Sequence, residues 1–359
     1  MKVLLVAQDI APSLAFELLA AELKSRGHEL TVLVGKGKVF PVSLNDVRNA
    51  ARATDVVVSG LSSSAKLSEP EVAACDEAVK NGKLLGFYGD TYHCHERARE
   101  GTQFGPYRKS AKFFFAINET EANDAKSVLE NAVRVATGNP TWEDYAFPKF
   151  TRAEVRAKYG VADDEILVLA PGIKNPAINF LNWGLLVEAL AGLPKKSRII
   201  ITTHHGDRTP FAVDPDKGNA PLNIYEDLKK FSSVPVTFLP NNIKTSDVLP
   251  GADVILAWNS GSVAVEAAYQ RIPIIAISTE IGRRKTYSES NTEKWEPVEL
   301  GFAIEATGRN LKDKLYIYTG QFEHVNDLKK RQAEVFPKPP EKGAAVKKMA
   351  DALESLIKK

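Results

Sequence analysis

Cysteine is scarce in this sequence, which has 359 residues and only two cysteines, Cys75 and Cys94. Two cysteines supply neither a disulfide framework nor the ligand spacing of a zinc finger, so we expect the protein in a reducing cytoplasm. An excess of charge of one sign is also missing, because 47 Lys and Arg residues oppose 45 Asp and Glu residues. The net charge of +2 therefore gives no reason to expect a general attraction to nucleic acid.

Long apolar runs are absent as well, and none approaches the length of a membrane span. The apolar run at 3–7 is too short for the hydrophobic region of a signal peptide, and Gln8 and Asp9 end it. This run is typical of a buried first strand. We therefore expect no transmembrane segment.

Strand-like and helix-like segments alternate along the chain. In the first half, apolar strand-like runs cover 3–7, 30–34, 55–59, 84–88 and 113–117. In the second half, they cover 166–170, 198–201, 236–239, 254–257, 274–277 and 302–304. Apolar residues at helical spacing predict helices at 179–193, 225–231, 263–270, 311–320, 322–335 and 344–357. Strands that alternate with helices predict parallel sheets covered on both faces.

The stretch "VATGNPTWEDYAFPKF", at 135–150, interrupts this alternation with glycine and proline. We therefore expect an α/β protein with two doubly wound, Rossmann-like parallel-sheet domains. The expected domains are 1–140 and 141–341, and a terminal helix at 342–359 is expected to cross back to the first domain. Ligands of such sheets bind at the carboxyl ends of the strands, so the default site is a cleft between the domains.

The stretch "ADVILAWNSGSVAVEAAYQ", at 252–270, has a strand-like run that ends in small polar residues and opens a helix. Free backbone N–H groups at Ser260, Gly261 and Ser262, together with the helix dipole, favour a phosphate. Glu266 follows about one turn later, where a carboxylate can accept hydrogen bonds from ribose hydroxyls. An N-capping serine and a solvated glutamate explain the same pattern, so spacing alone leaves both interpretations open.

This stretch resembles the donor-binding segment of GT-B fold glycosyltransferases. Three further segments agree with the family in order: "ATGNP" at 136–140 with its interdomain junction, "ILVLAPGIKNP" at 166–176 with its first C-terminal strand, and "VTFLPNNIKTSDVLPGADVILA" at 236–257 with its nucleobase loop. The nearest patterns are those of lipid-A-disaccharide synthase and the peptidoglycan N-acetylglucosaminyltransferase. The resemblance covers most of the chain in organisation, but its motifs are short.

The resemblance implies a nucleotide diphosphate sugar as the donor, with UDP as the expected nucleotide. It places Ser260, Gly261 and Ser262 at the diphosphate and Glu266 at the ribose. Gly172 would lie in the glycine-containing loop, and Asn242 and Ile243 would lie near the base. No other cofactor and no metal is implied. The acceptor stays open among a glycan, a lipid, a small molecule and a nucleic acid.

Many retaining GT-B enzymes carry two glutamates eight residues apart around this loop. Glu266 would be the second, and Trp258 occupies the first position, which favours an inverting enzyme. Such a direct displacement needs one general base and stabilisation of the leaving diphosphate. The related UDP-sugar 2-epimerases would show a His-Arg-Arg-Glu-Asn-like run where this chain has "GIKN" at 172–175. An epimerase and a non-catalytic nucleotide-sugar-binding protein both remain alternatives.

The catalytic base is expected in the first domain, because the second is assigned to the donor. Asp90 and His93 follow the fourth strand-like run, and Asp9 follows the first. Lipid-A-disaccharide synthases also place an important Asp after the fourth strand, so Asp90 ranks first, His93 second and Asp9 third. A turn-forming role for Asp90 explains its position equally well, and so does a pair in which Asp90 orients His93.

A DNA-modifying phage-type glycosyltransferase is a further alternative, because basic residues gather in several stretches. They are Lys36, Lys38, Arg97, Arg99, Arg108, Lys109, Lys112, Arg283, Arg284 and Lys285. Such residues usually form a solvated face. The adjacent pair His204 and His205 lacks a nearby Cys or carboxylate to complete a ligand set, so no metal site is expected there.

Overall fold

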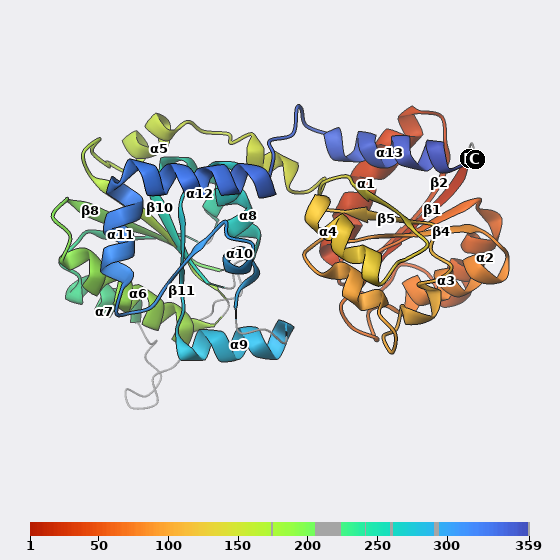
Figure 1. The fold of residues 1–359 in the computed structure, drawn as a ribbon, viewed down its shortest axis with the longest axis horizontal. Helices are drawn as coiled ribbons and strands as arrows, with labels where there is room; N and C mark the ends of the chain where they lie inside the picture. Colours follow the sequence, from red (N-terminus) through yellow and green to blue (C-terminus); the bar gives the residue numbers. More distant parts are fainter. Residues whose placement is uncertain (174, 205–223, 241, 259–260, 291–293, 358–359) are drawn as a thin grey trace. The chain divides into compact units, whose positions relative to one another are not determined.

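The computed structural model describes 1–173, 175–204, 224–240, 242–258, 261–290 and 294–357. The chain forms two compact units (Figure 1). Unit 1 comprises Met1–Asp144 together with Pro339–Lys359, and unit 2 comprises Tyr145–Lys338. The chain therefore passes between the units twice, at 144/145 and at 338/339.

Unit 1 contains a six-stranded sheet with the strand order β2-β1-β3-β4-β5-β6. Its strands are β1 (Lys2–Ala7), β2 (Glu29–Val34), β3 (Val56–Ser59), β4 (Leu84–Tyr88), β5 (Phe113–Ala116) and β6 (Val133–Ala136). All neighbouring strands pair in parallel. The expected parallel arrangement of the first sheet is thus confirmed.

Helices cover both faces of this sheet. They are α1 (Ile10–Ser25), α2 (Leu44–Ala53), α3 (Glu69–Lys80), α4 (Glu119–Asp124) and α13 (Ala344–Ile357). Alternate residues of β1 belong to different cores, because side chains of a strand point to opposite faces in turn. Val3 and Leu5 join the core under α1 and α13, and Leu4 and Val6 join the core under α2 and α3.

The helix α13 is held in unit 1 by a carboxylate at its start. Glu143 accepts hydrogen bonds from the backbone N–H groups of Gly343 (2.7 Å) and Ala345 (2.6 Å). Free N–H groups at a helix start carry a partial positive charge, so a carboxylate there is stabilising. Leu353, further along α13, is fully buried in the core that α1 shares.

Unit 2 contains the second six-stranded sheet, with the strand order β12-β11-β10-β7-β8-β9. Its strands are β7 (Ile166–Pro171), β8 (Ser197–Thr202), β9 (Val236–Leu239), β10 (Val254–Ala257), β11 (Ile274–Ile277) and β12 (Ile304–Ala306). These strands also pair in parallel throughout. The doubly wound α/β fold class is therefore confirmed in both units.

The longer helices of unit 2 flank its sheet in the same way. They are α5 (Arg152–Lys158), α6 (Pro176–Ala191), α7 (Ile224–Phe231), α8 (Gly261–Tyr269), α9 (Glu280–Ser290), α11 (Leu311–Gly320) and α12 (Phe322–Val335), and the short α10 (Glu296–Glu299) precedes β12. The core beneath α6, α7 and α11 includes Trp183, Leu228 and Leu311. Among the described helices, none is long and apolar enough to cross a membrane.

One strand was not expected from the sequence, and another was misplaced. No strand was expected at β6, of which only the last two residues fall in the segment interpreted as the interdomain junction. The last strand begins at Ile304 rather than at Phe302, whose ring packs instead against Phe336 with the ring centroids 5.1 Å apart. Both strands are short and lie at the edge of their sheet.

Replacing Glu143 by Ala should lower the free energy of unfolding by about 1–3 kcal/mol, because it leaves two N–H groups of α13 without their acceptor. The matched control is Asp144→Ala, which removes only an exposed ion pair with Lys342 and should cost about 0–1 kcal/mol. Urea denaturation measures both values. Equal effects of the two substitutions would show that Glu143 does not hold the helix.

Candidate functional site

The topological switch point of unit 2 lies between β7 and β10, which are neighbours in the sheet. After β7 the chain continues to β8 and β9 on one side, and after β10 it continues to β11 and β12 on the other. The loops after these two strands therefore diverge at the carboxyl edge of the sheet. Open α/β sheets bind ligands at such a point.

The loop after β7 is held tightly against the sheet. The N–H of Gly172 donates to the carbonyl of Thr202 (2.7 Å). The Asn179 side chain accepts from the N–H of Ile173 and donates to its carbonyl, each at 2.8 Å. A Cβ atom on Gly172 would lie 3.2 Å from the ring of Trp183 and 3.3 Å from Asn179. Glycine therefore suits the close packing of this loop.

The loop after β10 leads into α8, which begins at Gly261. Ser260 lies outside the described residues, and Ser262 is exposed on the first turn of the helix. Glu266, one turn further, is only 5% exposed. Burial, assisted by the nearby Asp247, raises the pKa of its carboxyl group to about 8. Within the described part of the chain, no hydrogen bond or ion pair holds this carboxyl group.

The loop after β9 reaches the same edge. Asn242 is exposed there, and the N–H of Ile243 donates to the carbonyl of Pro240 (2.9 Å). The hydroxyl groups of Thr202 and Thr245 are 2.8 Å apart and join this loop to the end of β8. The expected base-binding residues thus lie on the same edge as Gly172 and Glu266.

Arg283 is a positively charged residue at this edge. It lies on the first turn of α9, just after β11, and its guanidinium donates to the hydroxyl of Ser278 (3.1 Å). No carboxylate among the described residues pairs with it. Its neighbour Arg284 is exposed and pairs with Glu280 on the same helix. In the sequence the two arginines belong to one basic stretch, and only the fold separates them.

The switch point of unit 1 lies between β1 and β3. Asp9 follows β1, and its carboxylate accepts from the N–H of Ser63 (2.9 Å), in the loop after β3. The N–H of Asp9 in turn donates to the hydroxyl of Ser62 (3.2 Å). The two loops are therefore cross-linked directly by Asp9.

A fully buried carboxyl group, that of Glu71 on α3, lies beneath this cross-link. One of its oxygens accepts from the hydroxyl of Ser62 (2.9 Å) and from the N–H of Gln8 (3.2 Å), and the other has no partner. Burial raises its pKa to about 8. Nothing in the sequence marks Glu71, because a glutamate in the first turn of a helix is ordinarily solvated.

Asp90 is buried at the end of β4. Its carboxylate accepts from the thiol of Cys94 (3.3 Å), and its carbonyl accepts from the side-chain amide of Asn139 (2.7 Å). Burial raises the pKa of this carboxyl group, the positive charge of Arg97 opposes that rise, and the charge of Asp9 adds to it. Arg97 also donates to the carbonyl of Leu61 in the loop after β3.

His93 lies in a different setting from Asp90. It is exposed, adopts a left-handed backbone with a φ of 56°, and its N–H donates to the carboxylate of Glu121 (2.8 Å). Its ring centroid is 6.2 Å from that of His95, and both residues line a surface hollow with Glu96. No hydrogen bond joins His93 to Asp90. Asp9 and Asp90 lie at the same edge of the sheet, close enough for the charge of Asp9 to act on Asp90, whereas His93 lines a separate hollow.

Metal-ligating groups do not gather in the described part of the chain, where no three His, Cys, Asp or Glu side chains could hold one ion. Of the pair singled out in the sequence, His204 is described and His205 lies outside the described residues.

Comparison with known proteins shows which solved structures share this fold. No protein-family model matches the sequence, and no curated protein is similar to it. Solved structures do match. The UDP-GlcNAc 2-epimerase of Neisseria meningitidis bound to UDP-GlcNAc has a TM-score of 0.62 and 16% identity, covering 100% of both chains.

Two further structures match over nearly the whole chain. A glycosyltransferase of Rickettsia africae has a TM-score of 0.59 and 14% identity, covering 99% of this chain and 98% of its own. Anabaena HepE in complex with UDP has a TM-score of 0.55 and 13% identity, covering 99% and 100%. The chain has the GT-B fold. At these identities the likeness establishes the fold alone, and the resemblance drawn from the sequence is confirmed at that level.

In the GT-B fold of this chain, each unit presents its polar residues at a switch point. The carboxyl edge in unit 2 carries Gly172 and Asn242 from two loops and Glu266 from the helix α8. The edge in unit 1 carries Asp9 and Asp90. The binding and catalytic roles assigned to these residues stay predictions.

The stability of the GT-B fold should depend on pH through Glu71. Its folded pKa of about 8 exceeds its ordinary value of 4.5, so the folded protein retains a proton that the unfolded chain releases between these values. The contribution of Glu71 to the free energy of unfolding is fully present below pH 4.5 and is lost as the pH rises through 8. The loss is on the order of a few kcal/mol. In Glu71→Gln, which keeps the oxygen acceptor, this loss should disappear.

The matched control is Glu69→Gln, on the exposed side of the same helix. Urea denaturation between pH 5 and pH 9 measures all three proteins. The control should follow the parent protein. A Glu71→Gln variant with the same pH profile as the parent would contradict the assignment.

Proposed function

We propose that the protein is a UDP-sugar-dependent glycosyltransferase. Unit 2 would bind the donor, and unit 1 would supply the base that activates an acceptor hydroxyl. The observation that carries the donor part is the Glu266 carboxyl group, which is buried at the switch point without a partner in the described chain. A buried polar group without a hydrogen bond costs free energy, and two ribose hydroxyls would satisfy this one.

The remaining donor contacts follow from the same edge. The free N–H groups at the start of α8, around Gly261 and Ser262, would bind the diphosphate. Arg283 would oppose the negative charge that develops on the diphosphate as it leaves, because its own charge meets no carboxylate among the described residues. The loop with Asn242 and Ile243 would contact the base.

Trp258 supports an inverting transfer. It occupies the position at which many retaining enzymes of this fold carry a second glutamate. Its side chain is 2% exposed and packs against Trp295, with the ring centroids 6.1 Å apart. An indole in that position cannot act as a carboxylate. The transfer would then proceed by one displacement, with a single general base.

Asp90 is the first choice for that base. Burial raises the pKa of its carboxyl group toward the range in which proton transfer at neutral pH is efficient. Asp9, whose charge acts on Asp90, is the second residue to test, because the structure places it at the same edge. His93 ranks below both, since it lines a separate hollow.

A UDP-sugar 2-epimerase is the second candidate. Its support is the fold similarity to epimerases such as that of Neisseria meningitidis. Against it stands the run Gly172-Ile173-Lys174-Asn175, where the epimerases carry a His-Arg-Arg-Glu-Asn-like run. The two reactions differ in products: a transferase releases UDP only when an acceptor is present, whereas an epimerase inverts a sugar carbon and keeps the UDP attached. Product analysis with UDP-GlcNAc, with and without an acceptor panel, separates them.

Replacing Glu266 by Ala should weaken UDP binding roughly tenfold or more, because two hydrogen bonds between the ribose and this carboxyl group are lost. Isothermal titration calorimetry measures the affinity. Glu334→Ala removes an exposed carboxylate that pairs with Arg331 on α12, and should leave the affinity unchanged. If Glu266→Ala bound UDP as tightly as the parent protein, the ribose assignment would be wrong.

Replacing Asp90 by Asn should lower turnover by about a hundredfold or more while donor affinity stays the same, because only proton transfer is removed. Asn keeps an oxygen that can accept from Cys94, so folding should be retained. His93→Ala serves as the comparison, and a small effect is expected. If both variants kept parental turnover on the true acceptor, Asp90 would not be the base and Asp9→Asn would be the next variant to test.

A further inference from the structure

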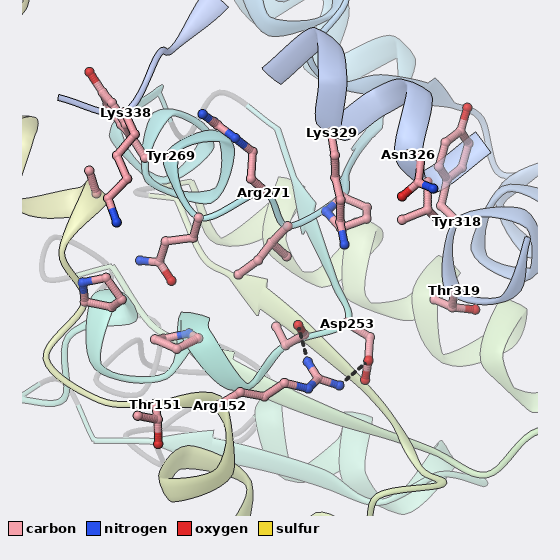
Figure 2. A pocket seen from close by; sticks show the side chains of 18 of the residues that line it. Thr151, Arg152, Asp253, Tyr269, Arg271, Tyr318, Thr319, Asn326, Lys329 and Lys338 are labelled. Carbon is pink, nitrogen blue, oxygen red and sulfur yellow. Dashed lines mark hydrogen bonds and ion pairs between the residues drawn. The ribbon is translucent and has the colours of Figure 1, made fainter. Parts of the chain in front are cut away.

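Unit 2 has a pocket with a volume of about 890 Å³ that is separate from the proposed donor site (Figure 2). Pockets of roughly 300–1,000 Å³ are typical of small-molecule sites. Its walls include the apolar side chains of Phe150, Ile272 and Phe322. Its charged residues are Arg152, Asp253, Arg271, Lys329 and Lys338.

This pocket lies at the amino edge of the sheet. Asp253 immediately precedes β10 and Pro273 immediately precedes β11, and both line it. Glu266 and Arg283 follow the other ends of these strands. A strand of four residues spans roughly 13 Å, so the pocket and the proposed donor site lie on opposite edges of the sheet.

The two arginines of the pocket already have partners. Arg152 forms an ion pair with Asp253 (2.5 Å) and donates to the carbonyl of Ala252 (3.0 Å). Arg271 donates to the carbonyls of Gln332 (3.3 Å) and Phe336 (2.7 Å), but no carboxylate among the described residues neutralises it. Burial lowers the pKa of Arg271, in keeping with a charge that is held in place without a counter-ion.

The two lysines of the pocket have no carboxylate partner in the described chain. Lys329 makes no ion pair, and Lys338 contacts only the ring of Phe147, with its amine 5.1 Å from the ring centroid. Figure 2 shows both side chains reaching toward the pocket, with Arg152 across from them, bonded to Asp253. The lining therefore carries four cationic side chains and a single carboxylate, Asp253.

We propose that this pocket binds a phosphorylated small molecule through Lys329 and Lys338. Three of these cations, Arg271, Lys329 and Lys338, meet no carboxylate among the described residues and repel one another, and a polyvalent anion would relieve that repulsion. Free lysine amines suit phosphate, which lysine binds as a compact point charge. The guanidinium groups of Arg152 and Arg271 are already bonded to protein oxygens, so the two lysines are the cations left to bind a ligand.

The pocket also touches both connections between the units. Ala146 and Pro148 follow the first passage of the chain at 144/145, and Lys338 precedes the second at 338/339. A ligand in the pocket would therefore contact both connecting segments at once. A bound ligand would therefore restrict the movement of these two segments.

Calorimetric titration with inorganic pyrophosphate at low salt tests the proposal, without UDP, which is itself a phosphorylated molecule and would compete for the pocket. The parent protein should bind pyrophosphate, and the double variant Lys329→Gln/Lys338→Gln should bind it at least roughly tenfold more weakly, since two charge-assisted hydrogen bonds are lost. The same loss of pyrophosphate affinity is expected whether or not the proposed donor site binds UDP. A failure of the proposed function therefore leaves this test intact.

The matched control is Lys330→Gln/Lys195→Gln, which removes two exposed lysines outside the pocket, one of them next to Lys329 on α12. This control should bind like the parent, and thermal unfolding should show that both variants fold. Equal binding by the pocket variant and the parent, or no binding by the parent, would overturn the proposal. Citrate, an anion of similar charge that carries carboxylates, should bind more weakly; equal or tighter binding would overturn the choice of phosphate.

Discussion

Parallel pairing of the strands is the constraint on which the rest of this molecule depends. Because neighbouring strands of each sheet run in one direction, the chain must return across a face of the sheet after every strand. The loops that follow the strands therefore collect at one edge. At the two switch points these loops diverge, and Asp9 in unit 1 and Gly172 in unit 2 stand there for that reason.

Three of the carboxyl groups buried near these edges have a raised pKa, because a charged group prefers water. They are those of Glu71, Asp90 and Glu266. Burial raises the pKa of each, and a packed apolar side chain in its place would avoid that cost. Carboxyl groups perturbed in this way are typical of functional sites. At these three positions a polar group near the edge of the sheet therefore lowers the stability of the fold.

The sheet of unit 2 separates two kinds of charge. Its carboxyl edge combines a buried carboxyl group, that of Glu266, with helix N-termini and Arg283. Its amino edge holds a pocket in which cations outnumber carboxylates. Because the strands between the edges are buried and apolar, neither group of charges reaches the other directly.

The sequence by itself determined the class of fold, because the alternation of apolar strands with amphipathic helices is a local pattern that needs no knowledge of distant contacts. It also located Asp9, Asp90, Gly172 and Glu266, since each follows such a strand. It missed β6, a short edge strand in which Arg134 interrupts the apolar run.

Tertiary structure alone decided which polar residues meet. Glu71 looks like an ordinary helical glutamate until the fold brings it the N–H of Gln8, 63 residues away. Arg152 and Asp253 are 101 residues apart in the sequence and meet only because α5 packs beside the turn that precedes β10. Local patterns cannot encode such meetings, because they depend on the order of strands within the sheet. That order follows from the packing of the whole unit.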